Sequence, residues 1–230
     1  MYMGFYDSYI GLFLLISIIP IWASFKVQNA FKKYSRVRSL SGYTGEETAR
    51  RILMMNGLGN VNIRPIRGSM TDHYNPLSKE VSLSETVYGQ NTLSAISVAA
   101  HEVGHAIQDA TGYSFLRARH KLYPVTNIAS QVSMPLIILG FISSFPGMVT
   151  IGLILFSFTT LFALVTLPVE LNASSRAIAA LSSSHILSED ELKGAKEVLN
   201  AAAFTYVAAA ATSILMLLRL ILIYGNRDRD

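Results

Sequence analysis

The sequence contains no cysteine among its 230 residues. Disulfide bonds and thiolate metal ligands are therefore excluded, and any tightly held metal must be bound by histidine and carboxylate side chains. Charge is also scarce, because Asp, Glu, Lys and Arg make up only 15% of the residues, compared with roughly 25% in soluble proteins. Hydrophobic residues make up 51% and gather in long runs, so we predict a mainly α-helical membrane protein.

The positive charge is distributed unevenly along the chain. Of the 19 Lys and Arg residues, 13 lie between Lys26 and Lys121, and no aromatic-interleaved basic motif accompanies them. This pattern favours membrane topology, with the positive segments in the cytoplasm, over nucleic-acid binding.

Four apolar runs are long enough to cross a bilayer as helices. Positive charges follow the first run and do not precede it, which favours a retained anchor with its N-terminus outside over a signal peptide. No charged residue occurs between Val125 and Pro168, so a tight turn at Pro146–Gly147 is expected to join two spanning helices. The runs comprise residues 9–25, 125–145, 148–167 and 201–224.

These features predict about four transmembrane helices plus a small cytoplasmic α+β domain. The expected regions are an N-terminal anchor, a cytoplasmic catalytic region, a transmembrane hairpin, a second cytoplasmic segment, and a C-terminal transmembrane helix with its tail. Their boundaries are residues 1–25, 26–124, 125–168, 169–200 and 201–230.

A helix and a small sheet are predicted in the first cytoplasmic region. Thr44 and Glu47 have the spacing of a capping box, which predicts a helix start. Residues 61–66 and 79–84 alternate like strands. An edge strand of such a sheet can bind an extended peptide through its backbone. His73 lies between these strands, where a loop or turn position is preferred over a role as a metal ligand.

The strongest chemical signal is the segment His101-Glu102-Val-Gly-His105. Its alanine-rich surroundings predict a helix, with a polar residue among 91–94 as the N-cap. On a helix, two histidines four residues apart project from one face and can bind one metal ion. Glu102 is then placed to take a proton from a metal-bound water. A buried, purely structural histidine pair is the alternative, although burial of such polar groups is costly.

A catalytic zinc site needs a third protein ligand and an open fourth position. Glu170 is preferred because it is the first acidic residue after Asp109 and lies where the third spanning helix re-enters the cytoplasmic side. Glu189, Glu191 and Glu197 are less suitable, because their surroundings are typical of a capped, solvated helix start.

Three blocks of the sequence resemble the YugP-type neutral zinc metallopeptidases of bacterial membranes. They are Asp72-His-Tyr, Ala99-Ala-His-Glu-Val-Gly-His-Ala-Ile-Gln108 and Pro168-Val-Glu-Leu-Asn-Ala-Ser-Ser-Arg-Ala177. The resemblance covers nearly the whole chain, and the layout is more distantly similar to the membrane gluzincins related to the heat-shock protease HtpX. It implies a zincin-like catalytic domain and a Zn²⁺ cofactor, with His101, His105 and Glu170 as ligands and Glu102 as general base.

The residues that orient the ligands are expected to differ from those of the relatives. In the HtpX-like proteins an aspartate follows the zinc-binding glutamate by four residues, whereas this chain has Ser174 at that position. We therefore expect the orienting role to pass to Asn172 or Arg176. Asp109, one turn beyond His105, is either a further orienting residue or a polar helix end.

We predict a zinc metalloendopeptidase, embedded in the bacterial plasma membrane as a multi-pass protein, that cleaves a protein or peptide substrate at the cytoplasmic face. Glu102 would act first as general base and then as general acid toward the leaving amine. His185, Tyr206 and Arg176 are the candidates for the oxyanion donor. The alternative is a non-catalytic membrane scaffold with a structural zinc site, and a membrane-protein partner or a homo-oligomer fits either function.

Overall fold

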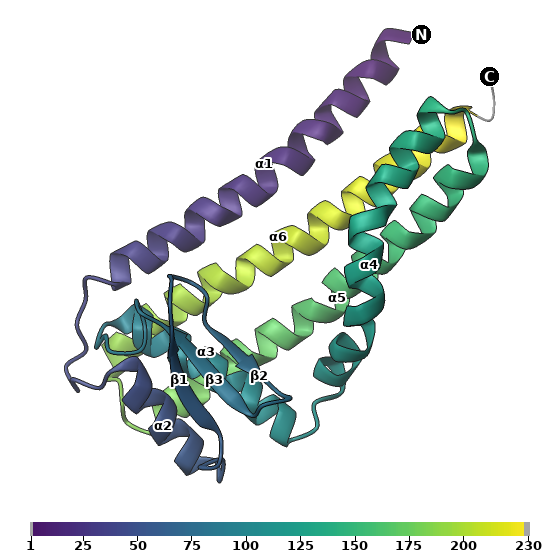
Figure 1. Ribbon diagram of the computed structural model, residues 1–230. Helices are drawn as coiled ribbons and strands as arrows, with labels where there is room; N and C mark the ends of the chain where they lie inside the picture. The colour runs from purple at the N-terminus through teal and green to yellow at the C-terminus, as the bar shows by residue number, and fades with distance from the viewer. Residues whose placement is uncertain (1, 228–230) are drawn as a thin grey trace. The chain divides into compact units, whose positions relative to one another are not determined.

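The computed structural model describes residues 2–227 of the chain and the side chains of residues 11–225. The described part consists of six helices and one three-stranded sheet (Figure 1). The elements are α1 (Tyr2–Tyr34), α2 (Gly45–Met55), β1 (Asn62–Ile66), β2 (His73–Asn75), β3 (Glu80–Ser84), α3 (Leu93–Ala110), α4 (Ser114–Ile142), α5 (Pro146–Ser183) and α6 (Glu189–Arg227). Residues 228–230, the end of the predicted tail, lie outside the described residues.

The chain divides into two compact units. The first unit comprises the residues up to Ser24, Ala118–Leu167 and the residues from Thr205 onward. The second unit comprises Phe25–Arg117 and Pro168–Phe204.

The first unit consists of apolar helix segments. Helices α1, α4, α5 and α6 each contain a stretch that is long and apolar enough to cross a membrane, in agreement with the four predicted runs. Few residues of these stretches are buried by protein, as expected for side chains that face lipid. Gly152 of α5 lies against Ile137 and the Ser133 carbonyl of α4, so these two helices pack closely along the predicted hairpin. The protein is therefore a mainly helical membrane protein.

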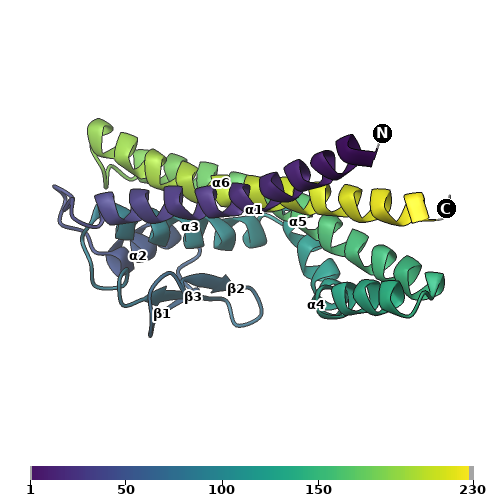
Figure 2. The ribbon, with the colours of Figure 1, turned by 90° about the horizontal axis from the view of Figure 1, so that it is seen from above.

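The second unit contains the sheet and a hydrophobic core around α3. Strand β3 is central, pairing in parallel with β1 and antiparallel with β2. The sheet lies on one side of α3 (Figure 2). The side chains at the centre of this core are fully or almost fully buried, and they come from α2, β3, α3 and the last part of α5: Ile52, Leu53, Val81, Leu83, Ile96, Val103 and Leu181.

The local predictions for this unit are largely confirmed. The capping box of α2 is present, because Glu47 N donates to Thr44 Oγ1 and Thr44 N donates to Glu47 Oε2. Strands β1 and β3 lie within the two segments predicted from their alternation. The loop or turn position predicted for His73 is wrong, because His73 begins strand β2. A three-residue strand is too short to show an alternating pattern, and its pairing with β3 forms only in the folded chain.

Candidate metal centre

Helix α3 carries the two histidines and the glutamate of the predicted motif. The helix begins after Thr92, whose Oγ1 accepts a hydrogen bond from Ala95 N at 3.3 Å, so Thr92 is the N-cap. His101 and His105 project from the same face, because they are separated by one helical turn. Their ring centroids lie 4.8 Å apart and their planes are inclined at 84°. The two imidazoles can therefore direct nitrogen atoms toward one point.

Glu170 of α5 completes a cluster with these histidines. Its Oε2 lies 3.2 Å from His101 Nε2 and 3.5 Å from His105 Nε2. One ligand atom from each of the three residues lies within 4.8 Å of the other two. Glu170 is only 2% exposed and His105 only 9%. The structure thus brings the predicted third ligand to the histidine pair across 69 positions of sequence.

A close contact of backbones makes this convergence possible. A Cβ atom at Gly104, between the two histidines, would lie 2.5 Å from the Ala173 carbonyl oxygen of α5. Only glycine leaves enough room at this contact. Gly104 therefore allows α5 to approach α3 closely enough for Glu170 to meet both imidazoles.

The donor atoms of the cluster fit a zinc ion. Two imidazoles and one carboxylate form a common ligand set of catalytic zinc sites, and three protein ligands leave the fourth position open. Burial acts to lower the pKa of His105, but the hydrogen bond with Glu170 and the charges of Glu102 and Glu170 raise it overall. The surroundings of this imidazole therefore favour positive charge.

Glu102 lies next to the cluster without belonging to it. Its side chain is buried, with 8% of the residue surface exposed. No hydrogen bond or ion pair of its carboxylate is recorded with the side chains described for residues 11–225, although its charge acts on His105. A buried carboxylate without a protein partner is available to accept a proton from a bound reactant.

The Nδ1 atoms of the two histidines, on the far side of each ring from Glu170, are also hydrogen bonded. His105 Nδ1 lies 3.0 Å from Gln108 Oε1, within α3. Gln108 Nε2 in turn donates to the Val169 carbonyl oxygen at 2.7 Å and to Asn172 Oδ1 at 3.0 Å. Gln108 was not predicted as a site residue, although its position three residues after His105 was a usable signal.

His101 has a different partner. Its Nδ1 lies 3.2 Å from the Oγ atom of Ser174, the residue at the position of the relatives' aspartate. A hydroxyl on α5 is therefore close enough to bond with the His101 ring, and the expected transfer of the orienting role to Asn172 or Arg176 stays a prediction. Asn172 is linked to His105 through Gln108, whose Nε2 donates to Asn172 Oδ1. Arg176 Nε donates to the same oxygen at 2.8 Å.

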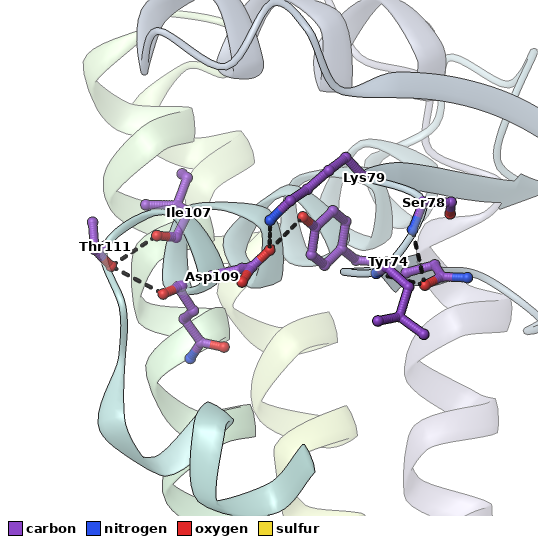
Figure 3. Close-up of polar contacts among 9 residues, drawn as sticks. Tyr74, Ser78, Lys79, Ile107, Asp109 and Thr111 are labelled. Atoms are coloured by element: carbon purple, nitrogen blue, oxygen red, sulfur yellow. Dashed lines mark hydrogen bonds and ion pairs between the residues drawn. The ribbon is translucent and has the colours of Figure 1, made fainter. Parts of the chain in front are cut away.

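Asp109 connects the sheet to the end of α3. Its Oδ2 accepts hydrogen bonds from Tyr74 Oη at 2.8 Å and from Lys79 Nζ at 2.5 Å (Figure 3). Burial and the bond to Asp109 raise the pKa of Tyr74 above its ordinary value. These bonds join strand β2 and the residue before β3 to the end of α3, and they match the predicted polar helix end better than an orienting role toward a ligand imidazole.

Two of the three rival carboxylates have partners elsewhere. Glu191 accepts hydrogen bonds from the backbone of Leu40 and Ser188, and Glu197 accepts from Lys33 and Tyr34. Glu189 is exposed in the first turn of α6. Among the described residues, the cluster contains neither these three nor His73, whose Nδ1 lies 3.0 Å from the Thr71 carbonyl oxygen.

The candidates for the oxyanion donor occupy different places. His185 follows the end of α5, and the helix between Glu170 and Ser183 corresponds to about 20 Å of axial rise. His185 therefore does not lie beside the cluster. Arg176 lies near it, linked through Asn172 and Gln108. Tyr206 belongs to the other unit, and its role stays a prediction.

Comparison with known proteins places this chain in a family. Residues 9–225 match the family model described as "Putative neutral zinc metallopeptidase". The chain is also similar to the "Putative membrane protease YugP" of Bacillus subtilis (strain 168), with 48% identity over 224 residues that cover 95% of this chain and 100% of the relative. No solved structure matches the chain.

Proposed function

Because the chain belongs to this family of neutral zinc metallopeptidases, we propose that it is a membrane zinc metalloendopeptidase. The observation that carries the proposal is the convergence of His101, His105 and Glu170 beside the buried carboxylate of Glu102. The first three residues would hold the zinc ion, and Glu102 would act on the reactants. This arrangement is the one required for hydrolysis of a peptide bond by a metal and a general base.

The metal ion and Glu102 have separate roles in the proposed reaction. Zinc, when bound, supplies a Lewis acid that polarises the scissile carbonyl and lowers the pKa of water from about 15.7 toward about 7. Glu102 takes a proton from the attacking water and then gives a proton to the leaving amine.

Strand β2 is suited to hold an extended substrate. It is an edge strand of the sheet and contacts α3, and Tyr74 bonds to Asp109 at the end of that helix. A peptide that pairs with an edge strand is bound through its backbone, so its side chains can vary. We therefore propose that the scissile segment binds in extended form along β2.

The site is proposed to lie at the cytoplasmic boundary of the bilayer. The uncharged part of α5 before Glu170, residues 146–169, corresponds to about 36 Å of helix, which exceeds the roughly 30 Å of a hydrocarbon core. Glu170 is therefore expected just beyond the hydrocarbon. The excess of Lys and Arg between Lys26 and Lys121 supports the cytoplasmic side.

Replacement of the general base tests the proposal. The full-length protein, purified in detergent and supplied with zinc, would be incubated with fluorescein-labelled casein. We expect Glu102→Gln to retain its zinc and to lower kcat by about 10²- to 10⁴-fold, because proton transfer is lost. Glu189→Gln, the same change at an exposed glutamate, is the matched control and should cleave like wild type.

Other results would contradict either the role of Glu102 or the peptidase function. Undiminished cleavage by Glu102→Gln would exclude the assigned base. Membranes that carry wild type or Glu102→Gln would also be compared for protein fragments. If the wild type binds zinc but cleaves neither casein nor any membrane protein, the result would favour the non-catalytic scaffold with a structural zinc site. Peptide fragments present only with the wild type would identify substrates.

A further inference from the structure

A series of hydrogen bonds connects Arg176, Asn172, Gln108 and His105. In this series, each group determines whether the next one donates or accepts. We propose that Gln108, held by Asn172, is a positioning residue that keeps the hydrogen of the His105 ring on Nδ1 and leaves Nε2 free for a cation. The inference rests on the metal site of the proposed function and adds to it the residues that prepare one ligand.

The order of donors and acceptors begins at Arg176. A guanidinium group can only donate hydrogen bonds. Arg176 Nε lies 2.8 Å from the side-chain amide of Asn172. The amide atom at this contact must therefore be the oxygen, Oδ1, which sets the orientation of the Asn172 side chain.

Gln108 is oriented by two acceptors at once. Its amide faces the Val169 carbonyl oxygen at 2.7 Å and Asn172 Oδ1 at 3.0 Å. Since neither oxygen can donate, the Gln108 atom that faces both must be the nitrogen, and its two hydrogens are both used. Gln108 is completely buried, so water cannot substitute for these partners.

The orientation of Gln108 determines the hydrogen position on His105. With the amide nitrogen occupied, the atom that lies 3.0 Å from His105 Nδ1 is the oxygen, Oε1. An amide oxygen only accepts, so His105 Nδ1 must carry a hydrogen. In the neutral ring, Nε2 then has a free lone pair, and this atom faces Glu170 Oε2 at 3.5 Å.

Glutamine suits this position better than similar side chains. A carboxylate at position 108 would place an oxygen against the Val169 carbonyl oxygen, where both atoms are acceptors. Methionine has a similar length but would leave His105 Nδ1 and two buried acceptors without their partner.

His101 lacks such a constraint. Its Nδ1 lies 3.2 Å from Ser174 Oγ, and a hydroxyl can either donate or accept. Ser174 is therefore compatible with either hydrogen position on His101. The two ligands of α3 differ in this respect, although they have the same residue type and lie one turn apart.

Three variants of the full-length protein test the role of Gln108. Gln108→Met removes the bond to His105. Asn172→Asp keeps an oxygen that accepts from both Arg176 and Gln108. The change removes no hydrogen bond of the Asn172 amide nitrogen among the described side chains. Ser174→Ala removes the hydroxyl beside His101 and leaves the bonds of His105 intact. Only the first variant should disturb His105.

Two measurements follow the effect without relying on proteolysis. Zinc affinity is measured by competition with a chelator, and Gln108→Met is expected to bind zinc about 10- to 100-fold more weakly, whereas Asn172→Asp stays near wild type. The ¹⁵N shifts of the imidazoles are measured for the metal-free protein in mildly alkaline buffer. The His105 signals, identified by their loss in His105→Gln, should show hydrogen on Nδ1 in wild type, Asn172→Asp and Ser174→Ala.

The outcomes separate this inference from the proposed function. Hydrogen on Nε2 of His105 in the wild type, or unchanged zinc affinity in Gln108→Met, would overturn the role of Gln108. An equal loss of affinity in Asn172→Asp would overturn it too. If Gln108→Met does not fold, the wild-type spectrum decides. If wild type shows the expected spectrum and zinc affinity but cleaves nothing, the positioning role stands and the peptidase proposal fails.

Discussion

Helices α3 and α5 contribute to the candidate centre in different ways. Helix α3 carries His101, Glu102 and His105 within little more than one turn. Helix α5 carries Glu170, 69 positions after His101, together with Ser174, which bonds to the His101 ring. The pattern on α3 is local and follows from helical spacing, whereas the contribution of α5 depends on how the two helices pack.

The packing contacts between these helices surround the cluster. Gly104 admits the Ala173 carbonyl, and Gln108 bonds to the Val169 carbonyl and to Asn172. Glu170 lies between these two contacts along α5. The motif on α3 therefore forms the His101, His105 and Glu170 cluster only through specific contacts with α5. The following variants test this division of roles.

Loss of one ligand from either helix is expected to have the largest effect. His105→Ala on α3 and Glu170→Ala on α5 should each lose most of the zinc after dialysis against a chelator, because two remaining protein ligands hold the ion weakly. Elemental analysis of the purified proteins measures this loss, with Glu189→Ala as the control. Full zinc content in Glu170→Ala would show that α5 does not supply the third ligand.

An intermediate effect is expected where the helix backbones meet. Gly104→Ala should destabilise the protein by about 1–3 kcal/mol, because its Cβ would lie 2.5 Å from the Ala173 carbonyl oxygen. It should also weaken zinc binding, since α5 must move away from α3. Thermal unfolding in detergent and chelator competition measure the two effects. Gly59→Ala, where a Cβ would meet nothing within 4 Å, is the control. Equal behaviour of the two variants would contradict the proposed packing role.

The smallest effect is expected at the C-terminal end of α3, where the helix contacts the sheet. Tyr74→Phe removes the hydrogen bond to Asp109 and should lower the free energy of unfolding by about 1 kcal/mol, without changing zinc affinity. Tyr123→Phe, at an exposed tyrosine, serves as the control. A clear loss of zinc affinity in Tyr74→Phe would instead support the alternative prediction, in which Asp109 orients a ligand imidazole.

Several features could be predicted because they depend on neighbouring residues. The capping box of α2, the helix that carries His101 and His105, and the long apolar runs all follow from local spacing and composition. Strand β2 was missed because three residues show no period and need β3 to form their hydrogen bonds. Gln108 was missed because its function depends on acceptors that α5 supplies.

By itself, the sequence determined the class of protein and the chemistry available to it. Without cysteine, and with two histidines on one helical face, the donor atoms for a metal had to be imidazoles and carboxylates. The sequence position of Glu170 favoured it as the distant carboxylate, but only the tertiary structure brought it to the two imidazoles and decided which nitrogen of His105 carries hydrogen. Both outcomes depend on distances of a few ångströms between α3 and α5, and such distances arise from backbone packing that local sequence patterns do not encode.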